Sequence, residues 1–233
     1  MESEKKLILL GFCSGAIPVI TEMADEIEDI RSFDIVKNVD VDQTKQKYAW
    51  EEYSIKSYLE NEYNSENFKK HKVHFGVLNS HIKYVLYEHF KHSKGVRREQ
   101  YLNLIHRSVF VSKSVKIDYG ILVEPISVVS SFTLLGFGVT IKRSCSVGHH
   151  CTLDDFVKLN PGVVISGNVK IGKGTEIGSG ATVSNHITIG KNCLIGAGSV
   201  VTKDIPDGVV AYGNPCRVIR ENERWVKAKN IIK

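Results

Sequence analysis

Paired cysteines are missing from this 233-residue sequence. Five cysteines are present, an odd number, and none stands in a CxxC spacing: Cys13, Cys145, Cys151, Cys193 and Cys216. This pattern argues against a disulfide framework and fits a reducing compartment.

Long hydrophobic runs are also missing. The apolar run from Leu7 to Leu10 is far too short for a signal peptide or a membrane span. The helix expected after it carries the acidic residues Glu22, Asp25 and Glu26. We therefore expect a cytoplasmic protein that does not insert into a membrane.

The sequence has no basic run and no aromatic motif of the RNA-binding type, and its net charge is only +5. These absences argue against a nucleic-acid partner. Apolar residues make up 42% of the chain and charged residues 24%, which is enough apolar material for a core. The mild positive charge suits an anionic nucleotide or coenzyme.

A hexapeptide period dominates the second half of the chain, because every sixth residue from Val111 to Val201 is aliphatic. These sixteen residues are Val111, Ile117, Val123, Val129, Leu135, Ile141, Val147, Leu153, Leu159, Ile165, Ile171, Ile177, Val183, Ile189, Ile195 and Val201. An unbroken six-residue period is the signature of a parallel β-helix.

The residue after each aliphatic position is often Gly, Ser or Asp, which we expect to suit a tight corner between faces. Three hexads then close one triangular coil of 18 residues. Residues 18 apart stack at the interstrand spacing of about 4.8 Å. The sixteen hexads predict a little over five coils.

Several segments carry a more specific similarity: Ile105 to Ser108, Val147 to Cys151, Ser166 to Gly172, and the Gly-x-Pro turn at Gly213. With the hexads, they resemble the bacterial sugar O-/N-acetyltransferases, which acetylate sialic acid or UDP-4-amino sugars. The resemblance implies a small Rossmann-like domain followed by a left-handed β-helix. It also implies acetyl-CoA as co-substrate, bound between neighbouring helices of a homotrimer, and a role in making cell-surface polysaccharide.

The N-terminal region alternates strand and helix patterns. Leu7 to Leu10 leads into a loop with Gly11 and Gly15, followed by helical spacing from Ile17 to Ile27. Such a loop would let the backbone approach a phosphate at a helix N-terminus. A plain turn is an equally good interpretation, because only two glycines of a glycine-rich loop are present.

A second strand is predicted from Phe33 to Val39, and Asp40 follows at its end, where an acidic residue commonly binds a nucleoside. The resemblance assigns uracil contact to this position. The alternative is a solvated pair of aspartates, since Asp42 is close by.

A further strand and helix are predicted over Lys72 to Val77 and Ile82 to Phe90, with Asn79 as a possible N-cap. The polar stretch from Lys91 to Gln100 predicts a linker. We therefore expect an α/β domain over residues 1–100 and an all-β domain over residues 101–233. The basic residues after Gly213 suggest a solvated tail.

His149 is the candidate catalytic base, because acyl transfer from a thioester needs a base and a donor for the oxyanion. Gly167 is 18 residues further on, so we expect it to stack one coil from His149 with an unhindered backbone N–H. The resemblance assigns the same roles to His149 and Gly167, and it places Gly213 at the coenzyme.

The sequence departs from the family beside this base. His150 stands where the family commonly has Glu or Asp to orient the catalytic imidazole, so we consider it a second catalytic candidate. Asp154 or Asp155 are other possible carboxylates. Lys158 stands where relatives carry a second His, which leaves the acceptor sugar open.

Two other functions compete with the transferase. A zinc site like that of the γ-class carbonic anhydrases would use histidines, but His150 and His186 are two coils apart, about 9.6 Å, too far to share one ion. A non-catalytic β-helix for assembly or sugar binding would need only the hexads. We therefore predict no metal and an acetyl-CoA-dependent N-acetyltransferase acting on a nucleotide-linked amino sugar. O-acetylation of sialic acid or another free sugar is the alternative.

Overall fold

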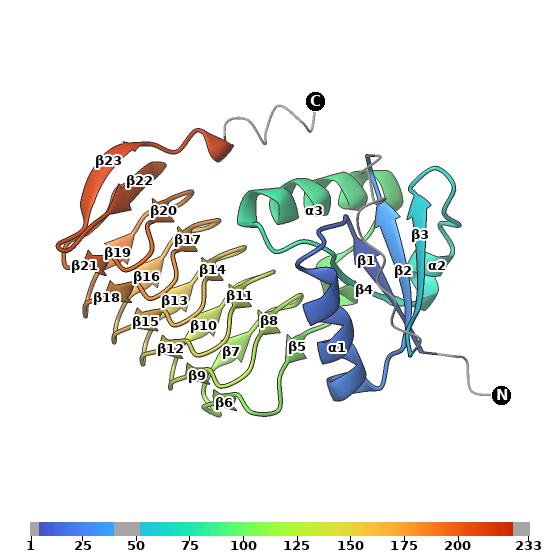
Figure 1. The fold of residues 1–233 in the computed structure, drawn as a ribbon, viewed down its shortest axis with the longest axis horizontal. Coiled ribbons are helices and arrows are strands. Elements are labelled where there is room, and N and C mark those ends of the chain that lie inside the picture. Colours follow the sequence, from blue (N-terminus) through green and yellow to red (C-terminus); the bar gives the residue numbers. More distant parts are fainter. Residues whose placement is uncertain (1–4, 40–51, 226–233) are drawn as a thin grey trace.

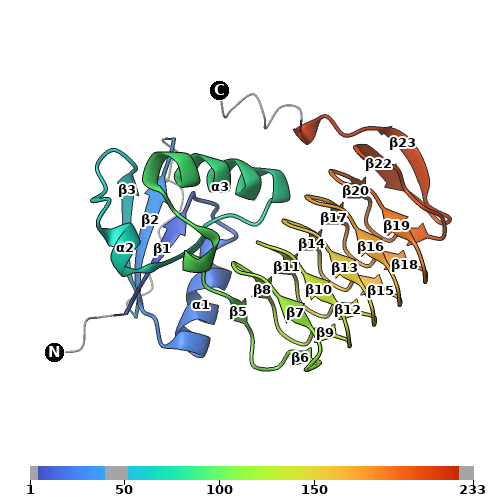
Figure 2. The same cartoon turned by 180° about the vertical axis from the view of Figure 1, so that it is seen from behind.

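The computed structural model describes residues 5–39 and 52–225, which form an N-terminal part with a parallel sheet and a C-terminal stack of β-coils (Figure 1). Seen from behind, α1 and α3 lie between the N-terminal sheet and the coils (Figure 2). Within the described ranges, no helix is long and apolar enough to cross a membrane.

The N-terminal sheet has four parallel strands in the order β3-β2-β1-β4. The elements of this part are β1 Lys6–Leu10, α1 Ile17–Glu28, β2 Ser32–Lys37, β3 Ser54–Leu59, α2 Asn67–Lys70, β4 Lys72–Phe75, α3 Ser80–Lys94 and the 3₁₀ helix η1 Arg98–Gln100. The predicted strands and helices are confirmed, but β2 ends at Lys37 and β4 at Phe75, two residues earlier than predicted. β3 and α2 were not predicted.

The predicted linker is partly wrong, because α3 continues through Lys94 and ends at Gly95 in the left-handed conformation. The segment after it is packed, since Arg98 pairs with Asp118 at 3.2 Å and with Asp155 at 2.6 Å. Asn79 is the N-cap residue of α3 but makes no side-chain capping bond. The Ser80 N–H donates instead to Glu176 Oε1 at 2.9 Å, a partner 96 residues away.

The β-helix begins with β5 Leu104–Ile105 and continues through sixteen strands of two residues each. They are β6 Phe110–Val111, β7 Lys116–Ile117, β8 Leu122–Val123, β9 Val128–Val129, β10 Leu134–Leu135, β11 Thr140–Ile141, β12 Ser146–Val147, β13 Thr152–Leu153, β14 Lys158–Leu159, β15 Val164–Ile165, β16 Lys170–Ile171, β17 Glu176–Ile177, β18 Thr182–Val183, β19 Thr188–Ile189, β20 Leu194–Ile195 and β21 Val200–Val201. Each predicted aliphatic residue is the second residue of its strand. The hexapeptide period is therefore confirmed.

The strands form three parallel sheets, one for each face of the coil. We name them face B (β5, β8, β11, β14, β17, β20), face C (β6, β9, β12, β15, β18, β21) and face D (β7, β10, β13, β16, β19). Pairs such as Leu135 with Leu153 confirm the 18-residue coil. The stacked sheets are consistent with the predicted left-handed β-helix. All the aliphatic positions are buried except Val111 and Ile117 in the first coil.

The corners do not turn at the residue directly after the aliphatic position, where the sequence predicted the turn. The backbone turns into the left-handed region three residues after the aliphatic position, at residues such as Gly120, His150 and Asn168. Glycine directly after the aliphatic position has another cause: a Cβ at Gly148 would lie 2.6 Å from the backbone carbon of Ser166 in the next coil. Small residues there permit close stacking of coils.

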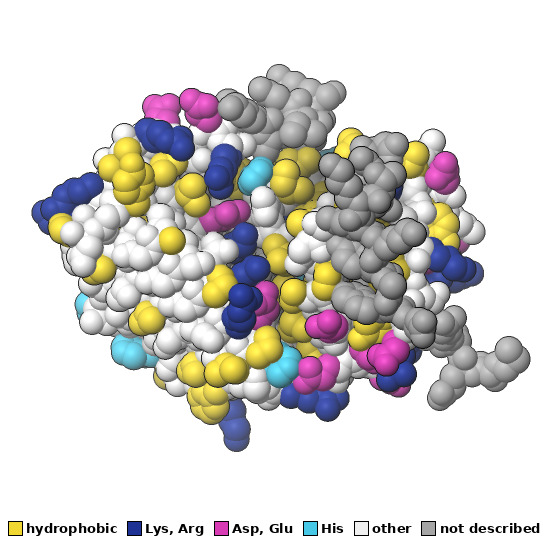
Figure 3. Space-filling model, viewed as in Figure 1, with side chains coloured by type: hydrophobic (Ala, Val, Ile, Leu, Met, Phe, Trp, Pro, Cys, Tyr) yellow, Lys and Arg dark blue, Asp and Glu magenta, His cyan; other side chains and the backbone are white. Residues whose placement is uncertain are grey.

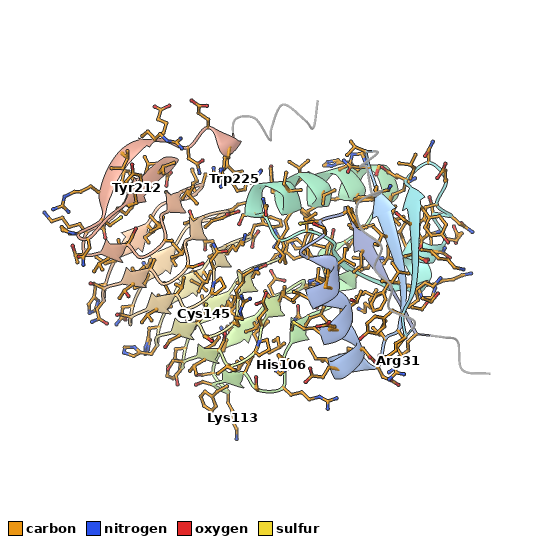
Figure 4. All side chains as sticks on the ribbon, in the orientation of Figure 1. Arg31, His106, Lys113, Cys145, Tyr212 and Trp225 are labelled. Atoms are coloured by element: carbon orange, nitrogen blue, oxygen red, sulfur yellow. The ribbon has the colours of Figure 1, made fainter. Side chains whose placement is uncertain are left out.

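The end of the chain differs from the expected solvated tail. β22 Val209–Tyr212 extends face B, and β23 Arg217–Glu221 pairs with it antiparallel after the predicted turn at Gly213. Trp225 is buried and lies beside the start of α3, 6.3 Å from the His81 ring (Figure 4). The chain therefore folds back from the last coil to the N-terminal part.

The N-terminal part packs on face B and on the corner between faces D and B. Phe75 contacts Phe137 and Phe156 of that corner at ring distances of 5.9 and 6.2 Å. The fully buried Lys83 of α3 donates to the Gly138 carbonyl at 3.1 Å and to Thr140 Oγ1 at 2.5 Å. The corner between faces C and D lies away from these contacts.

Candidate active site

His149 and His150 lie on the corner between faces C and D, directly after β12. Both side chains are exposed. His150 has a φ of 56°, so it occupies the left-handed position of the turn. The corner geometry therefore projects two adjacent imidazoles outward, as the sequence predicted for His149.

The two imidazoles contact each other. His149 Nδ1 is 3.0 Å from His150 Nδ1, and the ring planes are nearly perpendicular. The His150 ring also stacks on Phe132 of the preceding coil, with a centroid distance of 4.9 Å. Phe132 thus holds His150 while His150 holds His149, a contact that the sequence left open.

Gly167 stacks one coil beyond His149, as the 18-residue period predicted. A Cβ at Gly167 would lie 2.7 Å from His149 Cε1 and 2.8 Å from Nε2. Because glycine has no side chain, the imidazole can rest over the backbone of the next coil. Nε2 has no hydrogen-bond partner among the described residues.

The Gly167 N–H already has a partner, because it donates to Asn185 Oδ1 at 2.9 Å. The sequence pattern predicted that this N–H serves the thioester carbonyl, a role that did not include Asn185. The coil period contained the signal, since Asn185 is 18 residues beyond Gly167 and 36 beyond His149. The structure therefore adds a side-chain amide to the site.

The two aspartates considered as orienting carboxylates have other surroundings. Asp155 Oδ1 accepts the Phe137 N–H at 3.0 Å, and Oδ2 pairs with Arg98 on the far side of face D. Burial, and then the charge of Asp155, raise the pKa of Asp154. Among the described contacts, neither carboxylate reaches His149.

Lys158 lies on face B, nine residues or half a coil from His149. Its amine is 4.0 Å from Glu176 Oε2, and burial lowers its pKa. Basic and acidic side chains follow the crease between the β-helix and the N-terminal part (Figure 3). Lys158 and His149 therefore face opposite sides of the coil.

Gly213 is not brought to the histidine pair. Its carbonyl accepts the Val200 N–H at 3.0 Å, and its N–H donates to Ser199 Oγ at 3.2 Å. Val200 lies on β21, three coils from β12 along face C, or about 14 Å at 4.8 Å per coil. Only an extended ligand would touch both places.

The predicted nucleotide-binding residues have different surroundings. Gly11 is buried with a φ of 78°, and its N–H donates to the Val36 carbonyl at 2.9 Å, so this amide is engaged within the sheet. Gly15 is exposed next to the start of α1, and a Cβ added to it would have no heavy atom within 4 Å. Asp40 and Asp42 lie outside the described residues.

The geometry does not assemble a metal site from the described side chains. His150 and His186 both occupy left-handed corner positions, two coils apart. Throughout residues 5–39 and 52–225, no three His, Cys, Asp or Glu side chains gather in a way that could hold a metal ion.

Comparison with known proteins adds to this geometry. The model of the bacterial transferase hexapeptide family (six repeats) matches residues 151–185 and 168–203. Over 92 residues, the chain is 55% identical to galactoside O-acetyltransferase of Escherichia coli (strain K12). This match spans 39% of this chain and 30% of that protein.

Solved structures match over nearly the whole chain. The acetyltransferase domain of PglB from Neisseria gonorrhoeae FA1090, in complex with acetyl coenzyme A, is 26% identical with a TM-score of 0.76. That match covers 93% of this chain and 100% of the domain. A perosamine N-acetyltransferase mutant from Caulobacter crescentus, in complex with CoA and GDP-perosamine, shares the fold at 21% identity. Its TM-score is 0.76, with 94% and 99% of the two chains covered. The matched repeats lie within the sixteen observed hexads, so this part of the β-helix is similar to the bacterial hexapeptide-repeat transferases.

Proposed function

We propose that this protein is an acetyl-CoA-dependent N-acetyltransferase that acts on the amino group of a nucleotide-linked amino sugar. The observation that carries the proposal is the His149 imidazole, which rests over Gly167 on an exposed corner and has no Nε2 partner in the described part of the chain. The PglB domain, which matches over its whole length, supports acetyl-CoA as the donor.

His149 acts as general base in this proposal. In this proposal His149 Nδ1 donates to His150 Nδ1, so Nε2 is the unprotonated nitrogen that accepts a proton from the sugar amine. The amine attacks the thioester carbonyl directly, so no acyl group is carried by the protein. His150 replaces the family carboxylate in orienting the base.

The N-terminal part would hold the nucleotide, as a Rossmann-like domain over residues 1–100, and residues 101–233 would form the left-handed acyltransferase helix. The carboxyl ends of β1 and β4 lie at one edge of the sheet, where α1 and α3 begin. Ligands bind at this edge in open parallel sheets, which supports a nucleotide site in the N-terminal part. Gly15 lies open at this edge. Asp40 is proposed to contact the base of the nucleotide.

Transfer would then occur between protomers. The N-terminal part contacts face B, half a coil from His149, so a sugar held there faces away from its own base. A homotrimer would bring a neighbour's corner to it. Exposed apolar side chains on face C and its two corners support such an interface: Phe110 (63% exposed), Ile126 (72%) and Phe132 (60%). Acetyl-CoA is proposed to lie between neighbouring helices.

The test is thiol release from acetyl-CoA, measured with a panel of nucleotide-linked 3-amino and 4-amino sugars beside free sialic acid and simple amino acids. We expect turnover with nucleotide-linked amines only, and we expect Asp40→Ala to act mainly through KM. Equal turnover with a free sugar would show that the first hundred residues do not hold a nucleotide. Sedimentation of the purified protein tests the trimer.

O-acetylation is the second candidate, and the 55% identity to a galactoside O-acetyltransferase over 92 residues favours it. The matched segment accounts for 30% of that enzyme, so the identity covers only part of its length. A galactoside and sialic acid in the same panel distinguish the candidates, because each presents hydroxyl groups without a nucleotide. Coenzyme A binding separates both from a non-catalytic β-helix.

A further inference from the structure

We infer that Asn185 is a catalytic residue whose side-chain Nδ2 donates a hydrogen bond to the acetyl carbonyl during transfer. This inference rests on the proposed function and names a group that the hexapeptide motif did not single out. It reassigns the oxyanion contact, because the Gly167 N–H is already engaged by Asn185 Oδ1 at 2.9 Å.

The hydrogen bond fixes the orientation of the Asn185 amide. A backbone N–H donates only to an acceptor, so Oδ1 must face Gly167 and Nδ2 must point away from that nitrogen. Asn185 is exposed, and Nδ2 has no hydrogen-bond partner among the described residues. The corner therefore presents two free N–H bonds in a set direction.

The base and this donor lie on the same column of the corner. His149, Gly167 and Asn185 occupy equivalent positions in three successive coils. The imidazole approaches Gly167 from one side, with Nε2 2.8 Å from the place of a Cβ, and the Asn185 amide approaches from the other. Acyl transfer requires a proton acceptor and a donor for the oxyanion. Both groups lie beside Gly167.

The sugar nitrogen forms a bond to the carbonyl carbon, and its proton passes to His149 Nε2. The carbonyl oxygen takes the electron pair and accepts a hydrogen bond from Asn185 Nδ2. When the carbonyl re-forms, the carbon–sulfur bond breaks, and the CoA thiolate receives the proton from His149.

A purely structural role for Asn185 must be separated from this one. At another corner, the Phe137 N–H donates to Asp155 Oδ1 at 3.0 Å, also across 18 residues. This chain therefore already uses an aspartate for the same corner bond. Asn185→Asp should keep the corner and lose the Nδ2 donor, which makes it the matched control for structure.

The experiment compares the full-length wild type with Asn185→Asp and Asn185→Ala. We expect Asn185→Asp to lower kcat by roughly 10²- to 10³-fold, the usual loss of one oxyanion donor. Its unfolding midpoint and its dissociation constant for CoA, which lacks the acetyl carbonyl, should stay near wild type. Asn185→Ala should lose kcat as well, which shows that the added charge of Asp is not the cause.

A second measurement does not depend on the acceptor. The infrared carbonyl stretch of ¹³C-labelled acetyl-CoA should shift to lower wavenumber when bound to the wild type and to His149→Ala, but not to Asn185→Asp. An unshifted stretch in the wild type, or normal kcat in Asn185→Asp beside an inactive His149→Ala, overturns the inference alone. Failure to bind acetyl-CoA overturns the proposed function, and the inference with it.

Discussion

His149 and His150 contact each other through their Nδ1 atoms at 3.0 Å, so one ring must donate and the other accept. This contact restricts the orientation of the His149 ring, and in the proposed mechanism His149 Nδ1 is the donor. It leaves Nε2 of His149 as the nitrogen that faces Gly167.

The first prediction concerns the base. His149→Ala should leave a folded protein and lower kcat by roughly two to four orders of magnitude, the contribution of a positioned general base. Thiol release with acetyl-CoA measures the loss, and circular dichroism checks the fold. Near-normal turnover would remove His149 from the mechanism.

The second prediction separates the two contacts of His150. His150→Phe should keep the stacking on Phe132 and the left-handed turn, because Phe132 and Phe156 already adopt φ near 60° in this chain. It removes the Nδ1 atom that orients His149, so we expect a lower kcat at an unchanged unfolding midpoint. His150→Glu, which restores the family carboxylate, should recover activity. Wild-type kcat in His150→Phe would mean that the contact is only structural.

The third prediction concerns the space over Gly167. Gly167→Val places a branched side chain where a Cβ alone would be 2.7 Å from the His149 ring, so the ring must move. We expect acetyl-CoA binding, measured by calorimetry, to be lost while the unfolding midpoint is kept. A large drop in the midpoint with intact binding would show that Gly167 serves only the coil.

The fourth prediction tests the contact of the C-terminal segment with the N-terminal part. Gly174 and Gly180 both have a positive φ, near 70°, but a Cβ would overlap the Trp225 ring only at Gly174. Gly180→Ala should cost about 1 to 2 kcal/mol of unfolding free energy from backbone strain alone. Gly174→Ala should cost about 3 kcal/mol more, because it also expels a buried tryptophan.

Urea unfolding of both alanine variants, with and without Trp225→Ala, measures the coupling. Trp225→Ala should lower the free energy of unfolding only slightly when Gly174→Ala is present. It should lower this free energy by its full amount when Gly180→Ala is present. Equal costs in the two backgrounds would rule out the contact.

The fifth prediction is a pH dependence set by Lys83. Burial, and next the charge of Lys158, lower its pKa to about 7, while the charge of Glu176 opposes them. In the unfolded chain its pKa is about 10.4. Between these values the unfolded state holds the proton and the folded state does not. The free energy of unfolding should therefore rise with pH across this window, by up to about 1.4 kcal/mol per pH unit. The contribution of Lys83 to this free energy is lowest below pH 7.

Comparison of the wild type with Lys83→Met isolates this group, because other titrations cancel in the difference. Urea unfolding at four pH values from 7 to 10 should give a flatter curve for the variant. Parallel curves would show that Lys83 keeps its proton in the folded protein.

The sequence by itself determined the repeating geometry of this protein. One aliphatic residue in every six is a local pattern that repeats, and 18-residue stacking follows from it by counting, so His149 and Gly167 were correctly placed one coil apart. The parallel strands β1, β2 and β4 were also readable, because each contains several buried apolar residues. The left-handed positions of the corners were missed, since many of them are occupied by residues other than glycine, such as His150.

Only the tertiary structure decided which side-chain atoms meet. The contact between His149 and His150 depends on rotamers held by Phe132, and the Asn185 bond to Gly167 depends on which way an exposed amide turns. The packing of α3 on face B joins Ser80 to Glu176 across 96 residues, a separation at which no local pattern carries information. Periodicity fixes where a residue lies along the coil, whereas the direction of its hydrogen bonds depends on neighbours brought there by the fold.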